Sequence, residues 1–276
     1  TIRARAGYSP PKSGGGEEKI RREARVVLST AIAPGENGVT LCSHEDVRAL
    51  FHEFGHCIHE ILTETEMYSN AGCNGLVAQT DFVEIPAVLM ERFAWDPRVL
   101  GTFATHFITR EAPPDELLIS LAETRKAFAA VKAQEKIAFA LLDQEYHTRK
   151  WEGGVSVAAH ENGDIKENTS EITQRIFSKH FPVQSQPNPY GGSWETKWTH
   201  LADSQYAANY YTYVVAEVVS ANIWEKLFEK DPLNAESGKR YRNEVLAHGS
   251  GKDPSKILEG LLGENYLDPA AWLKAL

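Results

Sequence analysis

The segment His52-Glu53-Phe54-Gly55-His56 combines the residue types and the spacing of a metal-dependent hydrolytic site. Residues four apart lie one turn apart on the same face of a helix, so the imidazoles of His52 and His56 can bind one cation together. Glu53 lies beside them, close enough to take a proton from a metal-bound water. The same spacing also occurs by chance on solvated helices, where His59 would be one more surface histidine. The motif therefore needs a suitable structural context.

A carboxylate for the same cation is expected from the following helix. The sequence Asp81-Phe82-Val83-Glu84-Ile85-Pro86 opens that helix, with Glu84 in its first turn and Glu91 two turns further on. Acidic residues in a first turn often only interact favourably with the helix dipole, and this alternative stays open for Glu84. Two histidines and one carboxylate would leave the fourth position of a zinc ion for water, as in catalytic zinc sites.

Capping signals and hydrophobic periodicity predict the two helices that carry these groups. Ser43 and Asp46 resemble a capping box at the start of the first helix, and Phe82 to Trp95 forms the second. Apolar residues recur at helical spacing along the first helix: Val47, Leu50, Phe51, Phe54, Ile58, Ile61 and Leu62.

Helical patterns dominate the rest of the chain, so the fold class is expected to be mainly α. One small β element is expected before the histidine helix, where a strand over 24–33 can pair with 39–42. Residues 1–23, 151–168 and 182–194 are rich in Gly, Pro or polar residues and predict loops. Further helices are expected over 97–110, 115–149 (with one break), 170–181, 206–228, 236–247, 254–262 and 269–276.

The composition of the chain excludes several classes of partner. Its 276 residues allow one or two domains and a buried core. With 29 basic and 38 acidic residues the net charge is −9, which disfavours nucleic acid. No apolar run approaches ~18 residues, so no membrane span is expected. The three cysteines, Cys42, Cys57 and Cys73, cannot all pair and predict free thiols in a reducing, intracellular compartment.

The stretch FHEFGHCIHEI followed by TDFVEIPAVLMERFAWD resembles the thimet oligopeptidase family of zinc peptidases. The HEFGHxxH and DFVE-P signatures are much more specific than HExxH alone. Within this family, DFVEIPAVLMERFA and LLDQEYH are most similar to the mitochondrial intermediate peptidases. The resemblance implies a zincin-like helical catalytic domain with one zinc ion, in which His52, His56 and Glu84 are the ligands and Glu53 is the general base. The segment between the two motifs is a few residues longer than usual in the family, around 70–75.

Four tyrosines in eight residues form a second candidate group. Tyr206, Tyr210 and Tyr213 recur at i, i+4 and i+7, so they would share one helix face. Such tyrosines are often core aromatics with tethered hydroxyls, and this alternative stays open. The segment from His200 to Tyr213 resembles the HLA…Y-x-A-x-YY-x-Y pattern of the family. The resemblance implies that Tyr213 donates to the oxyanion, and that Tyr206 and His200 contact the substrate or the intermediate. The gap between His200 and Tyr206 differs by about one residue from common family versions.

A glycine-rich segment, Ala247-His248-Gly249-Ser250-Gly251, lies between two predicted helices. By composition it is a helix end followed by a linker, and its spacing does not match a phosphate loop. The resemblance implies a loop here that lies against the substrate backbone, with Gly249 as a substrate-binding residue.

The motif and the resemblance together imply a zinc-dependent endopeptidase that acts on short peptides or presequence-derived N-terminal segments. One catalytic domain is expected over 1–276, with the zinc site in 43–96 and substrate-side elements in 183–263. The resemblance implies that the family's N-terminal helical half is missing, and it favours the mitochondrial matrix, with the cytoplasm as the alternative. Two other interpretations stay open: a non-catalytic binding relative, and one half of a split enzyme that needs a partner chain.

Overall fold

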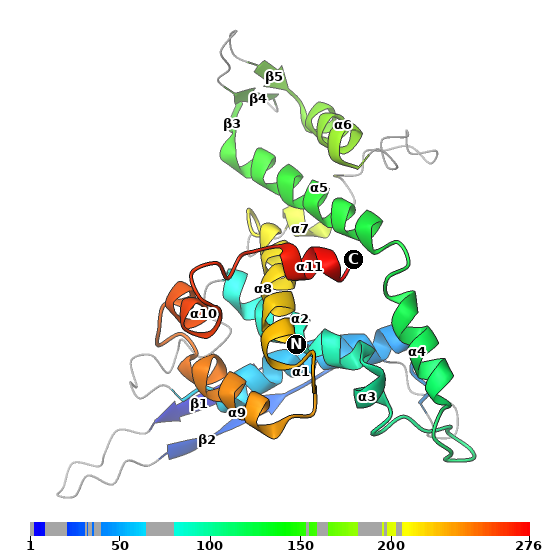
Figure 1. The fold of residues 1–276 in the computed structure, drawn as a ribbon. Coiled ribbons are helices and arrows are strands. Elements are labelled where there is room, and N and C mark those ends of the chain that lie inside the picture. Colours follow the sequence, from blue (N-terminus) through cyan, green and yellow to red (C-terminus); the bar gives the residue numbers. More distant parts are fainter. Residues whose placement is uncertain are drawn as a thin grey trace, which may run out of the picture. The chain divides into compact units, whose positions relative to one another are not determined.

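The structure is a computed structural model that describes residues 3–8, 21–30, 32, 35, 40–64, 80–152, 155–158, 165–181, 195, 198–202 and 206–276 (Figure 1). The chain divides into two compact units. Unit 1 contains residues 1–127 and 216–275, and unit 2 contains residues 128–215 with the final residue. The loops expected around 70–75, with Cys73, and over 182–194 lie outside the described residues.

Unit 1 begins with a two-stranded antiparallel sheet made of β1 (Arg3–Tyr8) and β2 (Arg21–Val27), in which Ala4 lies opposite Val26. A small β hairpin before the histidine helix is therefore confirmed, and the strand expected over 24–33 overlaps β2 at residues 24–27, but its predicted partner was wrong. Residues 3–8 were expected to be a loop, and the partner of β2 is β1 rather than 39–42. The strand β1 begins with alternating Arg and Ala, and Tyr8 is its only residue of a type that is enriched in strands, so the sequence shows no clear strand pattern there.

Two long helices follow, α1 (His44–Leu62) and α2 (Thr80–Trp95), and they pack against each other along their lengths. The capping box of α1 is confirmed: the Asp46 N–H donates to Ser43 Oγ at 3.2 Å, and the Ser43 N–H donates to Asp46 Oδ2 at 2.8 Å. The helices approach closely at Gly55. A Cβ atom there would lie 2.6 Å from both the Ala87 Cα and the Pro86 carbonyl oxygen.

The remaining elements of unit 1 surround this pair. They are α3 (Pro97–Leu100), α4 (Asp115–Thr124), the larger part of α8 (Tyr211–Leu227), α9 (Ala235–Glu244), the 3-10 helix η6 (Leu246–His248), α10 (Pro254–Leu262) and α11 (Ala270–Lys274). The expected helix over 97–110 ends after one turn, where Thr102 Oγ1 donates to the Val99 carbonyl at 2.7 Å. Fully buried apolar side chains form the core: Phe82, Ile85, Leu89, Ile223, Leu246, Ile257 and Leu261.

Unit 2 is built on α5 (Ala129–Thr148) and α6 (Thr169–His180), which pack together, with the short α7 (Thr199–Ala202). The break expected within 115–149 is confirmed at Phe128, where φ is +59°. Residues 151–168 were expected to be a loop, but they include a three-stranded antiparallel sheet of β3 (Lys150–Glu152), β4 (Val155–Ala158) and β5 (Ile165–Glu167). Strands of three or four residues are too short to show a clear alternation. The core contains Ala138, Leu142, Tyr146, Ile172, Ile176, Phe177 and Phe181.

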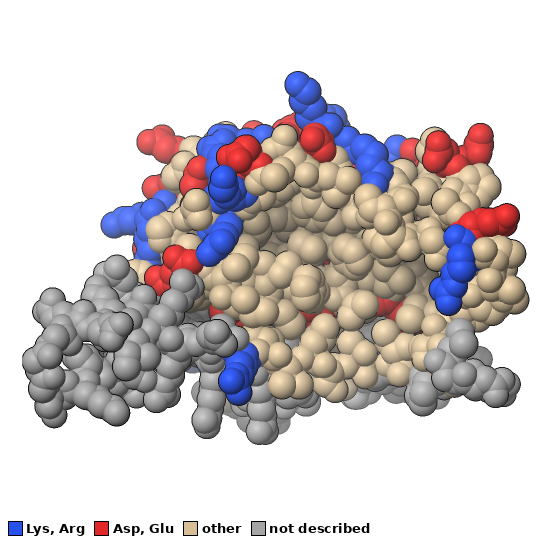
Figure 2. All heavy atoms as spheres, turned by 90° about the horizontal axis from the view of Figure 1, so that it is seen from below, with Lys and Arg blue, Asp and Glu red and all other residues tan. Residues whose placement is uncertain are grey.

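Two features of the described residues concern nucleic acids and membranes: the distribution of surface charge and the length of apolar helices. On the face drawn in Figure 2, Lys and Arg are interspersed with Asp and Glu and do not gather into one basic patch. Among the described helices, none combines the length and the apolar character needed to cross a bilayer.

Candidate metal centre

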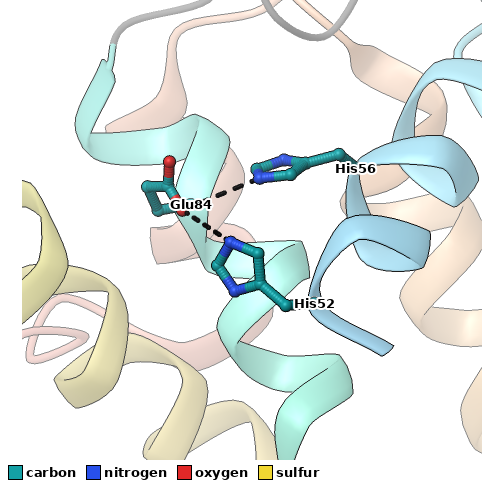
Figure 3. A group of neighbouring side chains, drawn as sticks. All are labelled: His52, His56 and Glu84. Atoms are coloured by element: carbon teal, nitrogen blue, oxygen red, sulfur yellow. Dashed lines mark ion pairs between the residues drawn. The ribbon is translucent and has the colours of Figure 1, made fainter. Parts of the chain in front are cut away.

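The side chains of His52 and His56 on α1 point toward that of Glu84 on α2, across the interface between the two helices (Figure 3). The distance to Glu84 Oε2 is 3.5 Å from His52 Nε2 and 3.7 Å from His56 Nε2. All three ligand atoms lie within 4.8 Å of one another. Ligands bound about 2.1 Å from a tetrahedral zinc ion lie about 3.4 Å apart, so this spacing suits such an ion.

The chemistry of these three groups also fits a cation. Glu84 Oε2 is buried and accepts no hydrogen bond from any described residue, and burial raises the pKa of Glu84. Burial, followed by the charges of His52 and His59, lowers the pKa of His56 to about 4, so this imidazole is neutral at neutral pH, as a metal ligand must be. A bound divalent ion would compensate this buried oxygen atom of the carboxylate, which otherwise accepts no hydrogen bond from the described residues.

The position of Glu84 differs from the expected one. Because α2 begins at Thr80, Glu84 lies in its second turn, and only Asp81 is acidic in the first. Favourable interaction with the helix dipole falls off within the first turn, so it does not account for this carboxylate.

Glu91 is a further residue of the site whose role was not predicted. Its Oε1 accepts a hydrogen bond from His52 Nδ1 at 2.7 Å, and its Oε2 lies 2.8 Å from Arg48 Nη1. Burial alone would raise the pKa of Glu91, but the contacts with His52 and Arg48 lower it. An ionised Glu91 that accepts from Nδ1 favours the tautomer in which Nε2 of His52 carries the lone pair, and Nε2 is the atom that lies 3.5 Å from Glu84 Oε2. Its spacing of seven residues from Glu84, two helical turns, was the available signal.

Glu91→Gln is expected to weaken zinc binding about 10- to 100-fold, because the amide holds His52 less firmly and does not raise its basicity as a carboxylate does. Competition with a chromophoric chelator measures the change. Glu45→Gln is the matched control, because Glu45 also contacts Arg48, at 2.7 Å, but is exposed and forms no ion pair with His52. Equal zinc affinity in the two variants would show that Glu91 does not support the ligand.

The remaining histidine of the motif lies apart from the three ligands. His59 is 1% exposed, its ring packs against Phe82 with centroids 5.7 Å apart, and burial lowers its pKa to about 4. Glu53 is half-buried, and its charge acts on both His52 and Glu84. The carboxylate expected to act as the base is thus near the three ligands, whereas His59 is a neutral core residue.

The tyrosine group lies in unit 2, and the helix expected to carry it begins later than predicted. The helix α8 starts at Tyr211 instead of 206, because Ala208 has φ +60° and leaves the helical region. Tyr206 therefore lies in a turn, and the three tyrosines do not share one helix face. The structure still brings two candidates together: Tyr213 Oη is 3.5 Å from His200 Nε2. The ring centroid of His200 is 5.0 Å from that of Tyr206.

Gly249 lies in unit 1, against the C-terminal end of α1. Its φ of +46° and ψ of −128° suit only glycine, and a Cβ atom would lie 2.4 Å from Thr63 Cγ2. Thr63 Oγ1 also donates to the His59 carbonyl at 2.7 Å. The structure thus explains the glycine by packing on the histidine helix, and a contact with substrate stays a prediction.

The sequence is also similar to a known family and to several characterised proteins. The chain matches the model described as Peptidase family M3 over residues 6–276. It is 34% identical to the mitochondrial intermediate peptidase of Homo sapiens over 81% of this chain and 28% of that protein. It is 35% identical to the mitochondrial intermediate peptidase of Malassezia globosa, over 88% of this chain and 28% of that protein. It is 31% identical to that of Arabidopsis thaliana, over 84% of this chain and 30% of that protein. The matched part thus spans less than a third of these relatives.

Proposed function

The chain belongs to peptidase family M3, and on this premise we propose that it is a zinc-dependent endopeptidase acting on short peptides or presequence-derived N-terminal segments. One observation carries the proposal: two imidazoles and a half-buried carboxylate place three ligand atoms within 4.8 Å of one another, with Glu53 next to His52 in the sequence. This arrangement supports a catalytic role over the alternative of a relative that only binds peptides, since every residue needed for hydrolysis at this centre is present.

His52, His56 and Glu84 would hold the zinc ion, which when bound supplies a Lewis acid and lowers the pKa of water. Glu53 takes the proton from the attacking water and then passes it to the nitrogen of the leaving amine. Tyr213 donates a hydrogen bond to the oxygen that becomes negative as the carbonyl carbon turns tetrahedral. His200 and Tyr206 contact the substrate beside that oxygen, and Gly249 lies along the substrate backbone.

The names of the relatives support a mitochondrial location, and we place the protein in the matrix. The matched part covers 28–30% of these relatives. The resemblance to the family implies a further helical half, and we propose that this half acts together with the chain, in the same polypeptide or as a partner chain. Peptides are the proposed substrates, and neither nucleic acid nor a membrane is a proposed partner.

Removal and return of the metal tests this function. Dialysis against 1,10-phenanthroline is expected to abolish hydrolysis of a quenched-fluorescence peptide library, and one equivalent of Zn²⁺ per chain is expected to restore it. Hydrolysis should stop because, without the ion, nothing lowers the pKa of the water whose proton Glu53 accepts. Metal analysis should give one zinc ion per chain. Turnover that survives complete chelation would exclude this mechanism.

A further inference from the structure

A buried carboxylate in unit 2 holds the turn that leads into α8. Asp143 lies on α5, and its side chain is 2% exposed. Its Oδ1 accepts a hydrogen bond from the backbone N–H of Ala208 at 3.1 Å, and its Oδ2 accepts one from the backbone N–H of Tyr210 at 2.9 Å. His147, one turn later on α5, lies with its Nδ1 3.0 Å from Oδ1. Both oxygens of this carboxylate are therefore used.

The next residue on α5 holds the same turn from its carbonyl side. Gln144 Nε2 donates to the Ala208 carbonyl at 2.9 Å, so both backbone polar groups of Ala208 are bound by α5. Ala208 has φ +60°, a conformation that residues other than glycine adopt only rarely. Such a conformation persists where the surroundings determine it, and Asp143 with Gln144 are those surroundings.

The held turn determines where a cluster of aromatic rings lies. The centroid of the Tyr210 ring is 5.0 Å from that of Trp198, 5.4 Å from that of His200 and 5.3 Å from that of Tyr213. Tyr210 is thus in contact with both members of the Tyr213–His200 pair. A shift of the Tyr210 backbone would move this ring and with it the two side chains packed on it.

We propose that Asp143 is the positioning residue for the Tyr213–His200 pair, acting through the backbone of Tyr210. The inference rests on the proposed function, in which Tyr213 donates to the oxyanion. A carboxylate is required because both of its oxygens accept from backbone N–H groups. An amide has one accepting oxygen, so Asn at this position would turn its own NH₂ group toward one of the two donors and leave it unsatisfied.

A double-mutant cycle tests the proposal, with kcat and KM measured for Asp143→Asn, Tyr213→Phe and the double variant of the full protein. Tyr213→Phe is expected to lower kcat about 100-fold, as for the loss of one oxyanion donor. Asp143→Asn should lower kcat about 10- to 100-fold with KM and zinc content nearly unchanged. The double variant should be no slower than Tyr213→Phe within about twofold, because the two changes remove one effect. Additive losses, or a Tyr213→Phe or Asp143→Asn enzyme with full kcat, would overturn the proposal.

Two further measurements keep the result interpretable. Asp115→Asn is the matched control, because Asp115 is an exposed carboxylate in the first turn of α4 with no hydrogen bond or ion pair to another described side chain. This variant should keep full activity. If Asp143→Asn does not fold, Gln144→Leu takes its place in the cycle. This variant should lower kcat less than Asp143→Asn would, and it should not lower kcat further when Tyr213 is already Phe. A different measurement would refute the proposed function itself: peptide turnover that survives the change Glu53→Gln. Additive losses in an enzyme that does need Glu53 refute only the role of Asp143.

Discussion

Glu53→Gln is expected to lower kcat for peptide hydrolysis by about 10²- to 10⁴-fold while the protein still binds one zinc ion. The amide has nearly the same size as the carboxylate but cannot accept the proton of the attacking water. Glu53 is not among the three groups whose ligand atoms cluster, so the metal should remain. Steady-state assays with a quenched-fluorescence peptide measure kcat, and metal analysis of the same sample measures the zinc content.

A second variant separates the base from the ligands. His56→Ala removes one of the three ligand atoms and is expected to lose both zinc and activity, whereas Glu53→Gln loses activity alone. Glu45→Gln, an exposed change in the first turn of the same helix, should leave both properties intact. Undiminished turnover by Glu53→Gln would mean that another group activates the water, and the mechanism would be wrong.

The approach of His52, His56 and Glu84 could be predicted because its determinants are local. The spacing of His52 and His56 within one helix fixes their common face, and a second amphipathic helix supplies Glu84 from a specific signature. The capping box at Ser43 sets the start of the first helix, which the structure reproduces. The exact turn of Glu84 was predicted incorrectly, because the helix was expected to begin at Phe82, whereas α2 begins two residues earlier, at Thr80. Thr80 and Asp81 are residue types that often precede a helix, so the sequence favoured the later start.

The tyrosine group could not be predicted to the same degree because its determinant is distant in the sequence. Helical periodicity continues through Tyr206 and Tyr210, but Ala208 adopts a left-handed conformation that Asp143 and Gln144 hold from α5. These contacts join residues more than 60 positions apart. Local propensity carries no information on such a partner, so the helix was extended by five residues too many.

Gly55→Ala is expected to destabilise the protein and weaken zinc binding at least tenfold. In an exposed helix the same change would stabilise by about 1 kcal/mol. At position 55 the new Cβ atom would lie 2.6 Å from the backbone of Pro86 and Ala87, so α1 and α2 must separate, which costs about 1–3 kcal/mol or more. Glu84 lies two residues before Pro86 on α2, and it would move away from His52 and His56 on α1.

Gly260→Ala is the matched control for this prediction, because Gly260 lies within α10 and no atom of the described residues would lie within 4 Å of its Cβ atom. That variant should unfold at the same temperature as the parent or a few degrees above it, with unchanged zinc affinity. Thermal unfolding with and without Zn²⁺ distinguishes the two effects of Gly55→Ala: the metal-free protein reports the packing cost, and the smaller zinc-induced shift reports the misplaced ligand. If Gly55→Ala matched Gly260→Ala in both measurements, α1 and α2 would not be held at the distance that brings the ligands together, and the metal centre would need another explanation.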